Sequence, residues 1–499
     1  MFLYQAVSVE LLLILGHFTV SVFALPSPPS SQIDGLYYLY NSTDGDHWKY
    51  TTTTCAPPIT KWNFVGSDVN PCDGWCGITC EGCSSSSVYC NITKIELPQM
   101  HLQGTLPQEV NLLTELTELK LPGPQNHLEG TDLSFACTIP NLKHFDLAET
   151  SINGTIPLCL WNSSTVNVLH LSENSLTGSI PANILSSSSP LEKIMLSSNS
   201  LHGVIPLELC QLSVLTYIDL SQNSLNGFLQ TCLGDLVGMQ YFALSRNFLH
   251  SRIPSEIGQM SVLSHLALSY NAFSSTIPTE FGLLLGLQYL YLSGTLLTGG
   301  LPEELGLLTG LMFADISVNL LLGGTMPASF GQLVQLSHLS LYFNDLHGTI
   351  PTELGALEAL TSLYLHFNEL SGTIPAGILQ PSALSFLSLQ NNTLTGPLPS
   401  PWSEALERVG LSNNFLSGEI PPAIGQLSAI RSIVLTDNDI SGSLPAIIGD
   451  NAWLLLEHWL AESNMITGSL PATIGQAESL QYFSMNANYL TGRVRGLYH

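Results

Sequence analysis

The cysteines and histidines are the residues of this chain whose types and spacing could support chemistry. Cys72, Cys76, Cys80 and Cys83 are close enough in sequence to hold a zinc ion, and the same thiols would form disulfides in an oxidising compartment. The 14 histidines are scattered without the spacing of metal ligands. The sequence contains no Gly-x-Ser-x-Gly, His-Glu-x-x-His, phosphate-loop or kinase signature. We therefore expect no catalytic residue, no metal site, no cofactor and no enzyme activity within these 499 residues.

The first 24 residues have the features of a secretory signal peptide. An apolar run over 11–25 includes the small-residue cleavage pattern Val22-Phe23-Ala24, although the segment carries no Lys or Arg. A membrane anchor is the alternative, but the run is too short and is followed by Pro26. No later segment is apolar for long enough to span a membrane. We therefore predict export, which favours disulfides over zinc for the 10 cysteines.

The composition excludes several kinds of partner. The chain has 12 Lys and Arg against 38 Asp and Glu, so its net charge of −26 would repel a nucleic acid or an anionic lipid surface. Apolar residues make up 45% of the chain and charged residues only 10%, which excludes disorder and predicts a large buried core.

From residue 95 onward the chain repeats one frame, which is clear in the segment Leu215–Gly227. Aligning the copies on their glycine gives 17 units between Gly104 and Gly492, with a period of about 24 residues. In each unit an alternating apolar pair, such as Ile218 and Leu220, points inward from a short strand. One unit can bury its leucines only against its neighbours, so this period and spacing predict a leucine-rich repeat solenoid.

An asparagine follows the strand in 13 of the units. Its amide can donate to the carbonyls and accept from the N–H groups of adjacent turns, so we interpret these residues as structural. They are Asn174, Asn199, Asn223, Asn247, Asn271, Asn319, Asn344, Asn368, Asn392, Asn414, Asn438, Asn464 and Asn488.

The Leu-x-Gly-x-Ile-Pro frame resembles that of plant-type leucine-rich repeat proteins, which include receptor-like proteins, receptor kinases and inhibitors of cell-wall enzymes. Trp48, Trp62 and the segment 71–80 are similar to that family's N-terminal cap, in which two cysteines, here Cys72 and Cys80, bracket a Trp and a Gly-Ile pair. Together the cap and repeats cover residues 33 to 499. The extra cysteines Cys76, Cys83 and Cys90 depart from this pattern and leave the pairing within the cap open.

The expected fold is an α/β solenoid: a right-handed superhelix with a parallel sheet on its concave face, short helical turns on its convex face and a disulfide-rich cap. The expected organisation is a signal peptide at 1–24, a cap at 25–91 and about 17 repeats over 92–499. The resemblance implies an extracellular recognition module for a protein, peptide or glycan, with a possible co-receptor. Two functions remain open: the ectodomain of a receptor-like protein in cell-surface signalling or defence, and a secreted inhibitor or binder of a cell-wall-degrading enzyme.

The four later cysteines form two pairs in the same register. Cys137 and Cys159 are separated by 22 residues, as are Cys210 and Cys232, and each pair spans equivalent positions of consecutive units. We predict one disulfide within each pair. Four small buried residues that stay reduced are the alternative, and Cα separations beyond about 7 Å would reject the bridges.

Aromatic residues recur at positions that face outward from the predicted strands. Neighbouring strands are about 4.8 Å apart, so rings at one strand position would form a ladder on the concave face. Such a rigid surface is typical of a protein or glycan interface. The position just before the inward strand residue is occupied by Tyr217, Tyr241, His265, Tyr289, Phe313 and His338. Neighbouring positions add Tyr270, Tyr291, Tyr342, Phe343, Tyr364, His366 and Phe367.

Alternatives to this binding surface are ordinary packing of the scaffold, the flank of the second sheet, and the cap. No Lys or Arg occurs over 253–407, where 11 Asp or Glu occur, and Asp219, Asp315 and Glu369 lie on or beside the aromatic positions. This charge favours a cationic or sugar partner, although acidic residues could equally serve only solubility.

Five Asn-x-Ser/Thr sequons predict glycans at Asn41, Asn91, Asn153, Asn162 and Asn391, which leaves residues 165–390 free of sugar. The last residues, 492–499, stop partway through a unit. We expect either the front part of a longer receptor, whose membrane span and possible kinase lie downstream, or a terminal coil that pairs with a partner. The corresponding locations are the plasma membrane, or the extracellular space as a secreted protein.

Overall fold

The structure, a computed structural model, describes residues 7–10, 19–22, 28–51, 55, 60–65, 69–83, 90–130, 132–184, 189–445 and 453–492. The chain divides into two compact units, Met1–Ser224 (unit 1) and Leu225–His499 (unit 2). Strands β1 (Val7–Glu10) and β2 (Thr19–Val22) pair antiparallel. The rest of the predicted signal peptide lies outside the described residues, so that assignment stays a prediction.

The cap of unit 1 is built around a cluster of aromatic side chains and is cross-linked by disulfides. It contains α1 (Ser30–Ser42), η1 (Gly45–His47) and β3 (Ile78–Glu81). Trp48 and Trp62 pack at 4.8 Å between ring centres, and the indole N–H of Trp62 donates to the carbonyl of Cys76 at 2.8 Å. The disulfides are Cys55–Cys76, Cys72–Cys80 and Cys83–Cys90, with Cα separations of 5.3, 5.7 and 4.8 Å.

These bonds settle the pairing that the sequence left open among the cap cysteines. The Sγ atoms of Cys72, Cys83 and Cys90 lie within 4.8 Å of one another, but all three sulfurs are already bonded. The cluster is therefore a pair of adjacent disulfides and offers no thiolate to a metal.

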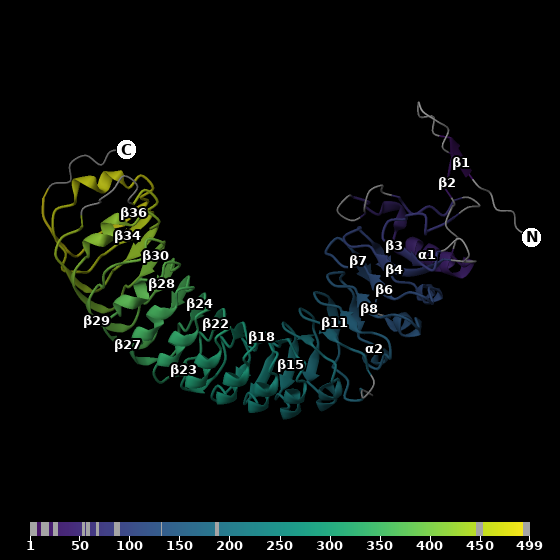
Figure 1. The fold of residues 1–499 in the computed structure, drawn as a ribbon, viewed down its shortest axis with the longest axis horizontal. Coiled ribbons are helices and arrows are strands. Elements are labelled where there is room, and N and C mark those ends of the chain that lie inside the picture. Colours follow the sequence, from purple (N-terminus) through teal and green to yellow (C-terminus); the bar gives the residue numbers. More distant parts are fainter. Residues whose placement is uncertain are drawn as a thin grey trace, which may run out of the picture. The chain divides into compact units, whose positions relative to one another are not determined.

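Strand β3 pairs antiparallel with β4, and from β4 onward the strands of unit 1 pair in parallel (Figure 1). These strands form the concave sheet of unit 1: β4 (Asn91–Glu96), β6 (Glu118–Lys120), β8 (His144–Asp146), β10 (Val168–His170), β12 (Lys193–Met195) and β14 (Tyr217–Asp219). Shorter strands lie along one edge, the flank: β5 (Gln103–Thr105), β7 (His127–Glu129), β9 (Asn153–Thr155), β11 (Ser175–Thr177) and β13 (His202–Val204). Helical turns are η2 (Gln108–Leu112), η3 (Ser134–Thr138), α2 (Leu158–Trp161) and η4 (Leu207–Gln211).

Unit 2 repeats the same arrangement, with its parallel strands in unbroken register from β16 to β36. Its concave sheet consists of β16 (Tyr241–Ala243), β18 (His265–Ala267), β20 (Tyr289–Tyr291), β22 (Phe313–Asp315), β24 (His338–Ser340), β26 (Ser362–Tyr364), β28 (Phe386–Ser388), β30 (Arg408–Gly410), β32 (Ser432–Val434), β34 (His458–Leu460) and β36 (Tyr482–Ser484).

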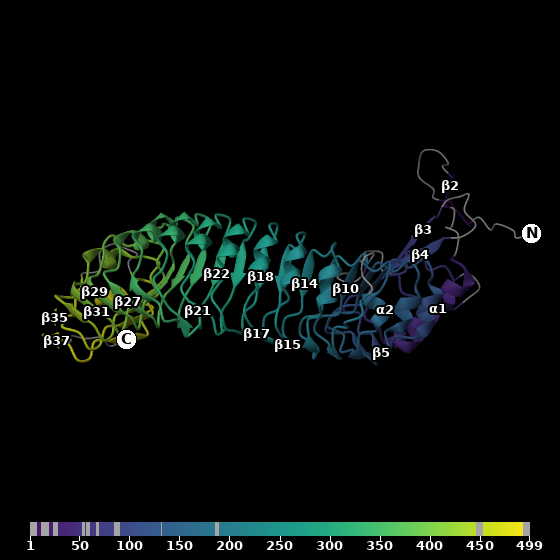
Figure 2. The same ribbon diagram turned by 90° about the horizontal axis from the view of Figure 1, so that it is seen from below.

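The flank strands of unit 2 run along one edge of its coils (Figure 2). They are β15 (Ser224–Gly227), β17 (Phe248–Ser251), β19 (Ala272–Phe273), β21 (Thr298–Gly299), β23 (Leu321–Leu322), β25 (His347–Thr349), β27 (Glu369–Gly372), β29 (Thr393–Pro397), β31 (Phe415–Glu419), β33 (Asp439–Ser441), β35 (Thr467–Gly468) and β37 (Tyr489–Leu490). The helical turns are η5 (Thr231–Asp235), η6 (Ser255–Gln259), η7 (Thr279–Leu283), η8 (Glu303–Leu307), η9 (Ala328–Gln332), η10 (Thr352–Ala356), η11 (Ala376–Leu379), η12 (Pro422–Gln426) and η13 (Ala472–Gln476).

The path of one coil follows from its sequence. Leu290 in β20 (Tyr289–Tyr291) and Leu292 just after it point inward and are fully buried, whereas Tyr289 and Tyr291 face outward and are half-buried. A proline such as Pro302 cannot donate to a strand ladder, and it precedes the turn η8, whose Leu305 returns to the core. Burying one such leucine contributes about 1.5 to 3 kcal/mol, and it does so only against the adjacent coils.

The asparagines after the strands form a structural ladder within each unit, interrupted by Thr150 in unit 1 and Thr295 in unit 2. Asn271, for example, donates its amide to the carbonyls of Leu244 and Leu268, both at 3.0 Å, and accepts from the backbone N–H of Leu249 at 3.0 Å. The same pattern recurs at Asn392 and Asn438. The structural interpretation of these residues is therefore confirmed, and each amide ties its own coil to the preceding coil.

Among the described residues, no helix is both long enough and apolar enough to cross a membrane.

Candidate functional site

The predicted aromatic surface lies on the concave sheet of unit 2. Tyr241, His265, Tyr289, Phe313 and His338 occupy the first position of β16, β18, β20, β22 and β24, and each is paired in register with the next. Tyr217 and Asp219 lie on β14 and belong to unit 1. The sequence thus placed these side chains on the correct strands and the correct face.

The expected ladder forms in part, since Tyr241 stacks on His265 and His265 contacts Tyr289 at 5.6 Å between ring centres. Beyond that point the ring contacts continue as a zigzag through the neighbouring strand position. The ring of Tyr291, at the third position of β20, lies 5.2 Å from His265 and 4.9 Å from Phe313, measured between ring centres. Tyr241 stacks on His265 at 4.2 Å, and Phe313 stacks on His338 at 4.3 Å. His338 then contacts Tyr364 at 5.3 Å. We call these six residues the aromatic chain: Tyr241, His265, Tyr291, Phe313, His338 and Tyr364.

Two further stacked pairs adjoin the end of the aromatic chain. Tyr342 and His366 lie 4.6 Å apart with their planes 5° from parallel, and Phe343 and Phe367 lie 4.1 Å apart at 16°. Phe343 and Phe367 remain 39% and 40% exposed, so mutual packing has not removed them from solvent. Scaffold packing therefore explains the order of these rings but leaves surface available for a partner.

Burial changes the titration of the histidines in this surface. Loss of hydration lowers the pKa of His338 below its ordinary value of 6.5, and the nearby Asp315 carboxylate opposes this only in part. Burial likewise lowers the pKa of His366, whose Nδ1 lies 2.9 Å from the hydroxyl of Ser388. Burial, together with the neighbouring Tyr289 and Asp315, raises the pKa of Tyr291. At neutral pH these shifts favour the neutral imidazoles of His338 and His366 and keep the phenol of Tyr291 a donor.

Two hollows in the concave sheet of unit 2 contain arginines that the sequence reasoning missed. One, of about 350 Å³, is lined by Tyr364, Phe386, Arg408 and Gly410. The other, of about 330 Å³, contains Arg246, whose guanidinium carbon lies 4.5 Å from the centre of the Tyr270 ring. The sequence did contain a feature that could have pointed to these arginines. Arg252 and Arg408 border the segment 253–407, which has no Lys or Arg, and Arg246 lies shortly before that segment.

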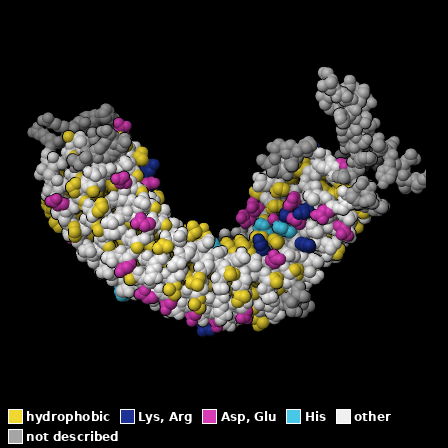
Figure 3. Space-filling view, in the orientation of Figure 1, with side chains coloured by type: hydrophobic (Ala, Val, Ile, Leu, Met, Phe, Trp, Pro, Cys, Tyr) yellow, Lys and Arg dark blue, Asp and Glu magenta, His cyan; other side chains and the backbone are white. Residues whose placement is uncertain are grey.

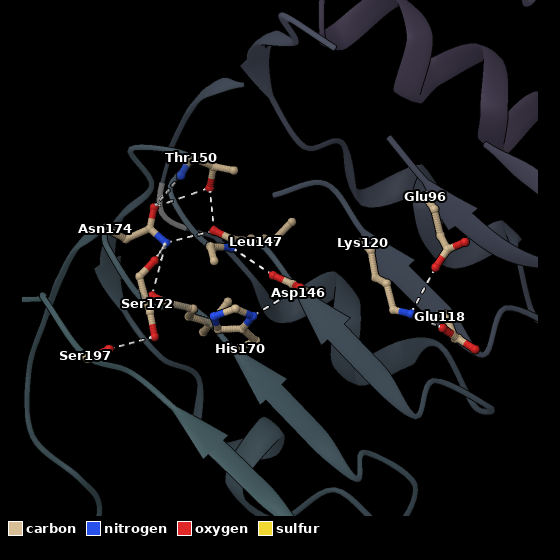
Figure 4. A network of polar contacts seen from close by, with 12 residues as sticks. Glu96, Glu118, Lys120, Asp146, Leu147, Thr150, His170, Ser172, Asn174 and Ser197 are labelled. Atoms are coloured by element: carbon tan, nitrogen blue, oxygen red, sulfur yellow. Dashed lines mark hydrogen bonds and ion pairs between the residues drawn. The ribbon is translucent and has the colours of Figure 1, made fainter. Parts of the chain in front are cut away.

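The concave sheet of unit 1 is different, because charged side chains gather over its strands (Figure 3). Lys94 pairs with Glu118 at 2.6 Å, and Lys120 pairs with both Glu118 and Glu96 (Figure 4). Burial disfavours the Glu118 carboxylate, but hydrogen bonds from Lys120 and Lys94 outweigh it and lower the pKa of Glu118 to about 2.

Farther along the same sheet, His170 lies 3.1 Å from Asp146, beside the amide network of Asn174 (Figure 4). Because these charges already pair with one another, this face offers a partner less unsatisfied charge than its composition suggests.

The predicted bridge between Cys137 and Cys159 is present, with a Cα separation of 5.8 Å. Cys210 and Cys232 are also disulfide-bonded, and because the other eight cysteines pair among themselves, the predicted bridge between these two is confirmed.

The five predicted glycan sites lie on surface elements and stay predictions. Asn41 and Asn153 are exposed, whereas Asn91, Asn162 and Asn391 are half-buried.

Parts of unit 2 match the family model described as Leucine Rich Repeat, at residues 286–308, 359–380 and 405–427. Receptor-like protein 32 of Arabidopsis thaliana is 34% identical to this chain over 84 residues, which are 17% of this chain and 10% of that protein. The chain thus spans about a tenth of the length of the curated relatives it matches. Neither the matched family model nor the described residues include a catalytic domain.

Solved structures of plant receptors share the fold. The Arabidopsis receptor kinase HAESA, in complex with the peptide hormone IDA and the co-receptor SERK1, is 27% identical with a TM-score of 0.77, over 93% of this chain and 78% of that chain. The plant peptide hormone receptor RGFR1 in complex with RGF2 is 25% identical with a TM-score of 0.54, over 80% of this chain and 81% of that chain. Sequence frame, cap and fold together show a leucine-rich repeat solenoid that is similar to plant receptor-like proteins and to the ectodomains of plant receptor kinases.

Proposed function

We propose that the chain is an extracellular recognition module of the receptor type, and that it binds an extended peptide across the strands of unit 2. The observation that carries this proposal is the aromatic chain, which runs from β16 to β26 on an outward face. Rings that hold one another in place lose little conformational freedom when a partner binds, so they make efficient anchors.

The dimensions of the aromatic chain suit a peptide. The five steps from β16 to β26, at about 4.8 Å each, give a length of about 24 Å. An extended peptide covers that distance with about seven residues. Side chains of such a peptide would reach the two hollows that adjoin the rings, one lined by Arg246 and one by Arg408.

The likeness to plant receptors supports the same class of ligand. HAESA and RGFR1 are each solved in complex with a peptide, and both share the fold of this chain. The absence of Lys and Arg from 253–407, together with its 11 acidic residues, favours a peptide with basic side chains. A role for a co-receptor, and a location at the cell surface, belong to this proposal.

A capture experiment tests the proposal. The immobilised chain is incubated with extracellular fluid of the source tissue, and retained peptides are identified by mass spectrometry. We expect the double variant Tyr291→Ala/Tyr364→Ala to retain at least about tenfold less of the peptides that the wild type enriches, because two ring contacts of about 1 kcal/mol each are removed.

A matched control removes two rings from the flank. Phe248 and Phe415 are 65% and 57% exposed on flank strands, so Phe248→Ala/Phe415→Ala should retain the same peptides as the wild type. Equal losses in both variants, or none in either, would place the site elsewhere. Capture of a folded cell-wall-degrading enzyme instead of peptides would favour the secreted inhibitor.

A further inference from the structure

A shallow trough crosses the strands of unit 2 beside the aromatic chain. Its floor consists of small residues whose side chains are buried. Ala267 is the last residue of β18, Ser269 follows β18, and Ser293 follows β20. Its walls are rings and one long side chain. The trough is the 330 Å³ hollow lined by Ser245, Arg246, His265, Ala267, Ser269, Tyr270, Tyr291, Ser293 and Asp315.

The trough has a cation at one end and an anion at the other. Arg246 follows β16 and is exposed, and it makes no ion pair with any residue in the described part of the chain. Its guanidinium lies over the face of Tyr270, which orients the group and leaves its N–H edges free for a carboxylate. No other Lys or Arg follows until Arg408, apart from Arg252, which lies next to the flank strand β17.

Asp315 is held at the other end by its own coil. The backbone N–H and the hydroxyl of Ser317 both donate to its Oδ1, at 3.1 and 2.6 Å. These two bonds fix the carboxylate and, within the described residues, leave Oδ2 to accept from a ligand. Tyr291, which also lines the trough, keeps its phenol proton because burial and the nearby Asp315 raise its pKa.

Gly294 makes the cationic end possible. It has a φ of +64°, and a Cβ there would lie 2.6 Å from Cδ1 of the Tyr270 ring. The missing side chain leaves room for this ring, which contacts Gly294 of the following coil and Arg246 of the preceding coil.

The spacing of the two coils that carry these charges defines a pattern in the ligand. Arg246 belongs to the coil of β16 and Asp315 to β22, three strands farther along, so their coils are about 14 Å apart. An extended chain advances about 3.4 Å per residue and covers this distance in four residues. We propose that the trough selects peptides that carry an acidic side chain and a basic side chain four positions apart, the acid at Arg246 and the base at Asp315.

This inference rests on the proposed peptide-binding function and adds a charge code to it. The probe is an array of ten-residue peptides with blocked ends, each carrying one Asp and one Lys at separations of two to six positions in both orders. The other positions vary among Ala, Ser, Pro and Tyr. We expect the full chain to bind peptides with a separation of four at least about tenfold more tightly than those with two or six, in one of the two orders.

Variants of the charged pair provide the decisive comparison. Arg246→Gln and Asp315→Asn each replace a charged side chain by a neutral polar one, and each should abolish the preference for a separation of four. Arg246→Asp/Asp315→Lys should invert the preferred order of acid and base. The control Arg252→Asp/Asp345→Lys makes the same charge changes at two exposed positions outside the trough and should leave the preference unchanged.

The outcomes separate this inference from the function on which it rests. Binding that depends on Tyr291 and Tyr364 but not on the charge separation would overturn the charge code and leave peptide binding intact. A preference that survives the charge reversal would also overturn it. If no peptide of the array binds while the captured peptides do, the code is wrong for the native ligand, and if neither binds, both proposals fail.

Discussion

The imidazole of His338 lies face to face with the ring of Phe313, with ring centres 4.3 Å apart and planes 5° from parallel. This arrangement covers one face of the imidazole and removes part of its hydration. It is therefore the neutral form of His338 that fits the surface, and its lowered pKa follows from the packing.

Acidification should weaken the fold through His338 and His366. Both have a folded-state pKa below the ordinary 6.5, so the unfolded chain binds protons at these sites more readily than the folded chain. Their contribution to stability is present above about pH 6.5 and is lost as the pH falls through their folded-state pKa. In calorimetry between about pH 7.5 and 5, His338→Gln/His366→Gln should lose less Tm than the wild type. His347→Gln, at an exposed flank position, should follow the wild type, and parallel curves for all three proteins would refute the prediction.

The asparagine ladder should be costly to interrupt. Asn271→Ala leaves the N–H of Leu249 and the carbonyls of Leu244 and Leu268 without their side-chain partner. Unsatisfied buried groups cost about 1 to 3 kcal/mol each, so we expect local opening to become about 2 to 4 kcal/mol easier. Hydrogen exchange of 244–271 should then be at least about thirtyfold faster. The exposed Asn226→Ala is the control, and similar exchange in both variants would mean that the ladder contributes little.

The repeat frame explains why so much of the fold could be predicted. Positions such as Leu290 and Asn392 recur in nearly every coil, and each has one environment that satisfies it. The repeat pattern failed to identify the residue after the strand only in coils that deviate from it. Asn126 makes the same contacts as the other asparagines, to the carbonyls of Leu97 and Leu121, but the irregular second unit concealed it. Thr150 takes the place of asparagine in the third unit and bonds the carbonyl of Leu147 instead.

The candidate site was predicted less completely, for a geometric reason. Alternation along a strand identifies which side chains face outward, so Tyr289 and Phe313 were placed correctly. Alternation does not show which rings touch, and the zigzag through Tyr291 depends on side-chain orientation. Arg246 was missed because it lies in a turn with a φ of 58°, beyond the strand where the pattern is read.

Ser251→Gly should stabilise unit 2. Ser251 replaces the glycine of its coil and is held at a φ of 72°, which costs a residue with a Cβ about 1 kcal/mol. We expect a gain of about 0.5 to 1 kcal/mol, because the substitution also removes the hydrogen bond between Ser251 and His250 and adds chain entropy. Thermal denaturation is the measurement. Ser275 occupies the same place in the next coil without a positive φ, so Ser275→Gly should give no gain, and equal gains at both positions would show that strain is not the cause.

Gly294→Ala should disturb the binding trough in addition to lowering the stability of the fold. Gly82 has a similar φ, +75° against +64°, and a Cβ on Gly82 would meet no atom within 4 Å, so Gly82→Ala measures the backbone cost alone, about 1 kcal/mol. At Gly294 the new Cβ also meets the Tyr270 ring, which must move because Cβ atoms do not approach to 2.6 Å. Moving the ring removes the support under Arg246, so we expect Gly294→Ala to lose the preference for peptides with a charge separation of four while peptides without the charge pair still bind.

Adding Tyr270→Ala to Gly294→Ala tests whether this effect acts through the Tyr270 ring. Because the clash is gone, the loss of unfolding free energy in the double variant should be close to that of Gly82→Ala. The double variant should not regain the charge preference, because Arg246 has lost its stacking partner. Recovery of the preference in the double variant would mean that Arg246 acts without Tyr270.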